Sequence, residues 1–149
     1  MGIEADVKQT KFKTVHNKVI VNLMYTSNWL YNSQLGVLKP HGLTVQQYNV
    51  LRILRGQSPN PVRINDIIER MLDKMSNASR LVDKLLQKGL VKRSTSGIDR
   101  RAVDVVITQA GLDLLAQLDE YQTNWESRLH TLDEAEANEL SLLLDKLRG

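Results

Sequence analysis

The stretch from Met75 to Thr108, MSNASRLVDKLLQKGLVKRSTSGIDRRAVDVVIT, constrains the fold of this chain more than any other segment. In its first part apolar residues recur at steps of three and four, the spacing of one buried helix face. Gly89 follows at the position that glycine favours at a helix end. The segments LVKRS and RAVDVVIT, joined by the turn TSGI, then predict two strands of a hairpin, and Val103, Val105 and Ile107 alternate onto one face of the second strand. The sequence therefore predicts one helix joined directly to two strands.

Residues with capping side chains predict where the helices begin. The predicted N-caps are Thr44, Asn65, Ser76, Thr108 and Thr131. Thr44 and Thr131 are each followed three residues later by Gln or Glu, which is the capping-box pattern. A long apolar repeat precedes Pro40, and the segment VRI at 62–64 suits a short edge strand. The helix after Asn65 is predicted to have an inner apolar face made of Ile67, Ile68, Met71, Leu72 and Met75. The predicted order is long helix, helix, short strand, helix, helix, strand, strand, long helix, helix.

Two central helices followed by a hairpin predict a winged helix-turn-helix in a mainly α (α+β) chain. We expect a single domain over residues 1–149, with the winged helix-turn-helix at 43–108. Within it, the recognition helix is predicted at about 76–88 and the wing at about 91–107.

The flanking helices, at 11–36 and 112–149, are predicted to form a helical dimerisation region. Their apolar seams exceed what so small a winged domain covers alone, and a two-fold dimer would bury the same seam on both copies. The alternative is that these helices pack only within one subunit. In the last predicted helix the seam consists of Leu140, Leu143, Leu144 and Leu147.

Charge separates the chain into thirds. Residues 52–101 carry twelve Lys and Arg against five Asp and Glu, whereas residues 102–149 carry three against ten. The middle third has a net charge of +7 and the last third −7, although the whole chain has only +3. A basic surface beside an acidic region is typical of a protein that binds a polyanion such as DNA. The alternative is a scatter of solvated charges.

The basic third contains the predicted recognition helix and wing. A helix that enters the major groove N-terminus first needs short polar and basic side chains in its first two turns. The predicted helix contacts to DNA are Ser76, Asn77, Ser79, Arg80 and Lys84. The predicted wing contacts are Ser96, Arg100 and Arg101, and Asp99 is expected to brace a neighbouring arginine. The alternative is a winged helix used for protein contact.

The segments SRLVDKLLQKGLVKR and DRRAVDVVITQAG resemble the recognition helix, wing and following helix of the MarR family of transcriptional regulators. The resemblance covers about residues 12–147. It implies an obligate homodimer whose first and last helices interlock and whose wings reach into minor grooves. It also implies a repressor that occupies a pseudo-palindromic operator, released in many members by a small, often aromatic acid bound between the dimerisation and DNA-binding parts.

The sequence departs from the family pattern at two places. The turn MLDKMSNAS lacks the glycine often found there, which leaves the path of that turn open. The chain has no cysteine, which excludes the thiol-oxidation switch used by one branch of the family. The leading interpretation is a sequence-specific regulator that binds double-stranded DNA, and a ligand-sequestering helical protein is a further alternative.

An effector pocket is the least constrained of the predicted sites. Its candidate residues lie near the end of the first long helix and are Met24, Tyr25, Trp29, Tyr31 and His41. The residues themselves do not identify a ligand, and the resemblance implies a small aromatic or phenolic one. The alternative is that these side chains belong to the core, because apolar stripes at helical spacing are usually core.

Catalytic and metal chemistry are not indicated. The three histidines have no carboxylate or second histidine at ligand spacing, so no metal site is expected. The sequence has no phosphate-binding glycine loop and no nucleophile elbow, and we expect neither an enzyme nor a cofactor. No apolar run reaches the roughly 18 residues of a membrane span, and the N-terminus lacks an apolar signal core. These features predict a cytoplasmic protein without a membrane partner.

Overall fold

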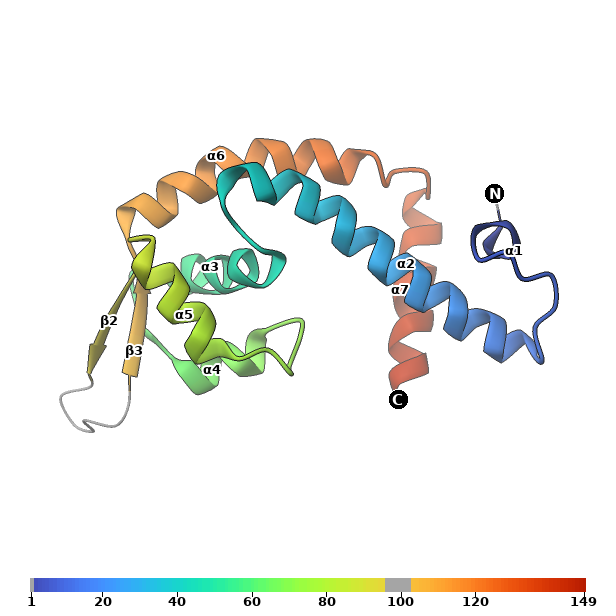
Figure 1. The fold of residues 1–149 in the computed structure, drawn as a ribbon, viewed down its shortest axis with the longest axis horizontal. Coiled ribbons are helices and arrows are strands. Elements are labelled where there is room, and N and C mark those ends of the chain that lie inside the picture. The colour runs from blue at the N-terminus through green and yellow to red at the C-terminus, as the bar shows by residue number, and fades with distance from the viewer. Residues whose placement is uncertain (1, 96–102) are drawn as a thin grey trace. The chain divides into compact units, whose positions relative to one another are not determined.

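The computed structural model describes residues 2–95 and 103–149 (Figure 1). The chain divides into two compact units, Met1–Tyr48 and Asn49–Gly149, and the boundary falls within helix α3 (Val45–Gln57). The order of helices and strands agrees with the predicted order, with one short helix added at the N-terminus.

The first unit consists of α1 (Ile3–Asp6), α2 (Val15–Leu38), the 3₁₀ turn η1 (Lys39–His41) and the start of α3. Helix α2 both begins and ends later than the predicted range of 11–36. Its N-cap is Thr14, whose hydroxyl accepts a hydrogen bond from the Asn17 amide at 3.0 Å. Gly42 closes η1 in the left-handed conformation at φ 74°, which glycine adopts without steric cost.

The short helix α1 is attached to α2 by an ion pair between Glu4 and Lys18. The hydrogen bond from Lys18 lowers the pKa of the Glu4 carboxyl, because it favours the ionised form. Ile3 of the same short helix is buried. The first unit therefore has polar and apolar contacts ahead of its long helix that periodicity did not predict.

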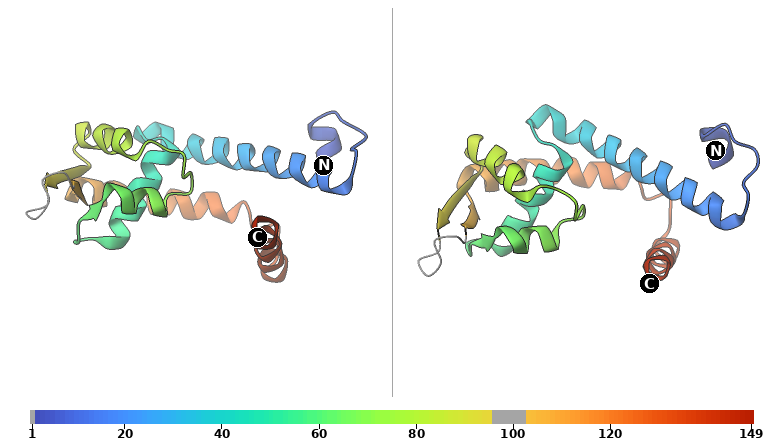
Figure 2. Two further views of the ribbon diagram at one scale, coloured as in Figure 1. Left: turned by 90° about the horizontal axis from the view of Figure 1, so that it is seen from below. Right: turned by 60° about the horizontal axis from the view of Figure 1, so that its bottom comes forward.

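The second unit contains the remaining elements: β1 (Val62–Arg63), α4 (Ile64–Arg70), α5 (Ala78–Gln87), β2 (Val91–Thr95), β3 (Val103–Ile107), α6 (Gln109–Ser127) and α7 (Glu134–Arg148). The three strands form an antiparallel sheet in the order β1-β3-β2, with Val62 paired to Val105 and Val91 paired to Ile107. Strand β1 lies at the edge, as predicted for residues 62–64. This is the winged helix-turn-helix fold, and Figures 1 and 2 show the β2–β3 hairpin projecting beside α5.

The core of the second unit contains apolar side chains from α3, α4, α5, the sheet and α6, whereas α7 has no buried residue. The fully buried ones include Leu51, Leu54, Ile67, Val82, Leu85, Val105, Leu115 and Leu118. Gly111 allows α6 to begin close to the preceding strands, because a Cβ there would lie 2.4 Å from the Leu90 carbonyl oxygen and 2.6 Å from Ile107. Thr108 joins the same place: its hydroxyl donates to the Gly89 carbonyl at 2.8 Å and accepts from the Gly111 amide at 3.2 Å.

The structure confirms some predicted helix caps and corrects others. The Thr44–Gln47 capping box and the Thr108 cap are confirmed. Asn65 lies inside α4, which begins one residue earlier at Ile64, so its predicted cap was wrong. The second capping box is formed by Asp133 and Glu136, two residues later than the predicted Thr131–Glu134 box. The start of α7 was misplaced because Thr131 and Asp133 both carry acceptor side chains close together, whereas α4 begins without any side-chain cap, since its N-cap is Arg63.

Candidate nucleic-acid interface

Helix α5 has one buried face and one open face. Ala78, Val82 and Leu85 are at most 1% exposed, which confirms the centre of the predicted apolar stripe. Leu81 and Leu86, at the edges of that stripe, are only partly buried. The opposite face carries exposed polar side chains: Ser79, Arg80, Asp83, Lys84 and Gln87. Packing of the apolar face therefore holds the helix in place while its polar face stays accessible.

The recognition helix begins two residues later than predicted. Asn77, not Ser76, is the N-cap, and its side-chain oxygen accepts a hydrogen bond from the Arg80 amide at 3.1 Å. Ser76 is half-buried and lies in the turn before the cap. Among the predicted DNA contacts, Ser79, Arg80 and Lys84 lie on exposed helical turns, whereas Asn77 also has a structural task as the cap. The predicted helix contacts therefore lie just before α5 or in its first two turns.

The turn before α5 differs from the prediction. The apolar face predicted for α4 continued through Leu72 and Met75, but α4 ends at Arg70. Ile67 and Met71 are buried, whereas Leu72 is 88% exposed and Met75 is 92% exposed. Helical periodicity failed here because the chain leaves the helix at Met71, whose backbone is extended.

An ion pair links the recognition helix to the wing. The Arg93 guanidinium on β2 donates to a carboxylate oxygen of Asp83 on α5 at 2.9 Å. Both side chains are about half exposed, at 46% and 55%. This ion pair was not predicted from the sequence. The contact orients one arginine at the base of the wing, as the brace predicted at Asp99 was expected to do farther along it.

The predicted wing contacts lie largely beyond what the structure describes. Ser96, Asp99, Arg100 and Arg101 are outside the described residues, so the wing contacts and the brace remain predictions. On either side of them, β2 and β3 pair from Val91↔Ile107 to Thr95↔Val103.

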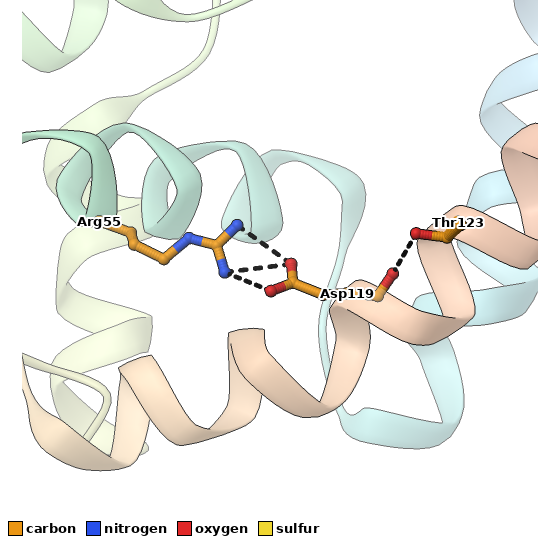
Figure 3. A network of polar contacts seen from close by, with 3 residues as sticks. All are labelled: Arg55, Asp119 and Thr123. Carbon is orange, nitrogen blue, oxygen red and sulfur yellow. Dashed lines mark hydrogen bonds and ion pairs between the residues drawn. The ribbon is translucent and has the colours of Figure 1, made fainter.

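A second ion pair connects the winged part to α6. Arg55 on α3 donates three hydrogen bonds to the two carboxylate oxygens of Asp119 on α6, at 2.9–3.1 Å (Figure 3). The Thr123 hydroxyl donates to the Asp119 backbone carbonyl at 2.9 Å. A bidentate guanidinium–carboxylate pair fixes distance and orientation together. It therefore anchors α3 against the helix that follows the wing.

The residues predicted for an effector pocket lie in the first unit. Met24, Tyr25 and Trp29 stand on α2 with exposed fractions of 64%, 40% and 50%, and His41 is half-buried in η1. Tyr31 donates a hydrogen bond to the Gln46 side chain at 3.3 Å. The three α2 side chains are thus accessible rather than core, and the pocket itself remains a prediction.

The described residues form neither a metal-ligand cluster nor a membrane-spanning helix. Across residues 2–95 and 103–149, no group of three His, Cys, Asp or Glu side chains is placed to hold a metal ion. In the same part of the chain, no helix combines the length and apolar character that a membrane crossing requires.

Comparison with known proteins identifies relatives over both the winged part and the whole chain. A family model described as MarR family matches residues 41–102. The chain is 31% identical to a MarR transcription factor from Planctomyces limnophilus of known structure, with 91% of this chain and 98% of that one covered and a TM-score of 0.70. It is 37% identical over 67 residues to the HTH-type transcriptional regulator YfiV of Bacillus subtilis (strain 168), a match that covers 45% of this chain and 41% of that protein.

The fold is also similar to more distant structures. The S. aureus MepR–DNA complex contains a chain with a TM-score of 0.78 and 20% identity, and 92% of this chain and 97% of that one are covered. The match to the Planctomyces limnophilus structure extends over nearly the full length of both chains, and the fold is a winged helix-turn-helix with flanking helices. The chain therefore belongs to the MarR family of winged-helix, DNA-binding transcriptional regulators.

Proposed function

We propose that the protein is a homodimeric repressor that binds a pseudo-palindromic operator sequence-specifically and releases it when a small aromatic ligand binds. The start of α5 would read base edges in the major groove, lysine and arginine side chains would contact phosphates, and the wing arginines would reach into the minor groove. The proposed cytoplasmic location follows from this DNA target.

The division of α5 into two faces is the single observation that supports this proposal most strongly. Its apolar face is packed to at most 1% exposure, whereas Arg80 and Lys84 on the other face are open to solvent. A recognition helix needs this combination, because the face that contacts base edges must be accessible while the packed face holds the helix in position. The MepR–DNA complex, which has a similar fold, shows that a chain of this fold can be bound to DNA.

Exposed apolar side chains on α2 and α7 support the proposed homodimer. On α2, Val15 is 74% exposed and Ile20 52%, and on α7, Leu142 is 69% exposed and Leu147 59%. Exposed apolar surface of this extent usually marks an interface. Two-fold pairing would cover the same surfaces on both copies and would set two recognition helices about 34 Å apart, which is one turn of the duplex.

The proposed effector site uses the accessible aromatic side chains of α2. Tyr25 and Trp29 are four residues apart and therefore lie on the same side of the helix. Aromatic side chains with a polar tip suit a flat ligand that also needs a hydrogen bond. Trp29→Ala should abolish the release of operator DNA by a panel of small aromatic acids, and its operator affinity without ligand should match that of the unaltered protein.

The proposal is tested by selecting duplexes from a random pool with the full-length protein. We expect a two-fold symmetric consensus, which would establish specific DNA binding and dimer geometry together. Arg80→Ala should then weaken binding to that duplex by about 1–3 kcal/mol and relax the preference at one base pair of each half-site. Gln117→Ala, an exposed polar change on α6, is the matched control and should leave the affinity unchanged.

The salt dependence of binding separates this function from a winged helix used for protein contact. Several neutralised phosphates give a steep fall of the association constant with salt, whereas a protein-contact module gives no such slope with DNA. Arg100→Ala and Arg101→Ala should each weaken operator binding at fixed salt without lowering the melting temperature. The proposed function would be contradicted if the selection enriched no sequence, or if the affinity changed neither with salt nor on Arg80→Ala.

A further inference from the structure

Two apolar side chains in the turn before α5 are almost completely uncovered. Met75 is 92% exposed and Leu72 88% exposed, the highest values among the large apolar side chains in the described part of the chain. Neither contributes to the core, although the turn lies directly between the two central helices of the winged domain. Exposed apolar surface next to a binding element indicates a contact with the bound partner.

The turn that carries these side chains is held by hydrogen bonds. The Met75 amide donates to the Asp73 side chain at 2.9 Å, and the Ser76 amide donates to the Asp73 carbonyl at 3.2 Å. The Leu72 amide donates to the Asn49 side chain on α3 at 2.9 Å. The exposure of Met75 is therefore a property of a fixed backbone, which presents the side chain in a defined place.

Met75 stands two residues before Asn77, the cap of the recognition helix, and three before its first residue. The first turn of the helix after it carries the exposed Ser79 and Arg80, and Lys74 precedes it. These neighbours are polar or basic, and the nearby acidic residue, Asp73, accepts the hydrogen bond from the Met75 amide. An apolar side chain in this setting suits a partner that is anionic yet presents an apolar group. In the major groove, that group is the C5-methyl of thymine.

We propose that Met75 contacts a thymine methyl group in each half-site and so adds a specificity element to the recognition helix. This inference rests on the proposed DNA-binding function. Methionine is suited to the contact, because its unbranched thioether chain adapts to an irregular surface. Leu72 is not assigned this role: it lies five residues before the cap, and its backbone is bound to α3.

The experiment removes the methyl group from the DNA and the side chain from the protein, singly and together. The probe is the duplex most enriched by the full-length protein from a random pool, with each thymine in turn replaced symmetrically in both half-sites by deoxyuridine. Fluorescence anisotropy at fixed salt gives Kd for each pair. At one thymine position the Kd of the unaltered protein should rise roughly fourfold per half-site, because one methyl-sized apolar contact is lost.

The same replacement should leave Kd nearly unchanged for Met75→Ala, whose binding to the thymine duplex is already weakened. Leu72→Ala is the matched control: it removes a similarly exposed side chain from the same turn and should keep the full sensitivity to deoxyuridine. The melting temperature of Met75→Ala should equal that of the unaltered protein, because a side chain that is 92% exposed contributes little to the fold. This measurement separates a lost contact from a damaged structure.

The outcomes also separate this inference from the function on which it rests. A symmetric operator whose affinity is indifferent to every thymine replacement overturns the Met75 contact and leaves the DNA-binding function intact. The same holds if Met75→Ala keeps the sensitivity of the unaltered protein, or if Leu72→Ala loses it at the same thymine. A pool that yields no enriched sequence overturns the proposed function and this inference together.

Discussion

Helices α5 and α7 place their apolar side chains in opposite ways. In α5 the apolar face is buried, with Ala78, Val82 and Leu85 at most 1% exposed. In α7 most leucines are open: the exposed fractions are 45%, 69%, 56% and 59% for Leu140, Leu142, Leu143 and Leu147, and Leu144 is half-buried. Both helices have apolar residues at helical spacing. The spacing alone therefore does not show which helix is buried within its own subunit.

The two helices therefore depend on different contacts for their stability. Helix α5 is fixed by its own chain, so its polar face is presented in place before any partner arrives. A helix as short as α7 is marginal in water without tertiary packing, and its open leucines are available to a second copy. We infer that α5 depends on the core of one subunit and α7 on the proposed dimer. The predictions that follow test this contrast, from the largest expected effect to the smallest.

Leu85→Ala should produce the largest loss of stability. The side chain is fully buried, so its removal leaves a cavity and should lower the free energy of unfolding by about 2–5 kcal/mol. Urea denaturation followed by circular dichroism measures the change. Lys84→Ala, on the open face of the same helix, is the control and should stay within about 0.5 kcal/mol. Equal losses for both variants would mean that α5 has no distinct buried face.

Leu143→Asp should act on assembly instead of on the fold of one subunit. Because Leu143 is 56% exposed, an aspartate there would not enter the core of one subunit. In the proposed dimer the charge would be buried, and it should weaken dimerisation by about 1.5–3 kcal/mol or more. Sedimentation velocity over a range of protein concentrations measures the dimer constant. Ser141→Asp introduces the same charge about 200° around the helix and serves as the control. A dimer unaffected by Leu143→Asp would contradict the role given to α7.

Asp133→Ala should loosen α7 by about 0.5–2 kcal/mol, because the Asp133 carboxylate accepts a hydrogen bond from the Glu136 amide at 2.8 Å. The Asp133 amide in turn donates a hydrogen bond to the Glu136 carboxylate at 3.0 Å, so the substitution leaves the capping box with only this one of its two bonds. Hydrogen exchange of the first α7 amides measures the change. Thr131→Ala removes the residue that sequence reasoning took for the cap and should have almost no effect. Faster exchange in Thr131→Ala than in Asp133→Ala would reverse the assignment.

Apolar spacing was enough to predict the order of the elements, because a helix with a covered face repeats its apolar residues whatever its neighbours are. The centre of the α5 stripe and the alternation of β3 were predicted correctly for this reason. The same rule failed at Leu72 and Met75, where apolar residues continue the spacing after the helix has ended. Periodicity records which residues are apolar but not where the backbone leaves the helix.

The caps and ion pairs were harder to predict for two physical reasons. Ser76 and Asn77 both carry acceptor oxygens, and the path of the backbone decides which of them caps the helix. In the structure Asn77 is the cap and accepts a hydrogen bond from the Arg80 amide. The partners in an ion pair lie far apart in the sequence, as Arg55 and Asp119 do, and only the packing of α3 near α6 brings them together. The residue types of the candidate site were readable from the sequence, whereas their partners were not.

The Asp83–Arg93 pair should contribute the least stability, and this small value sharpens the contrast between α5 and α7. Both side chains are about half exposed, so solvent and salt screen the 2.9 Å contact, and a double-mutant cycle with Asp83→Asn and Arg93→Gln should give a coupling below about 1 kcal/mol. The coupling should fall further at high salt. A weak pair would mean that the polar face of α5 is not needed to hold the helix and is therefore free to bind. A coupling several times larger and insensitive to salt would show that this face is itself structural, and the division of α5 into a packed and a binding face would fail.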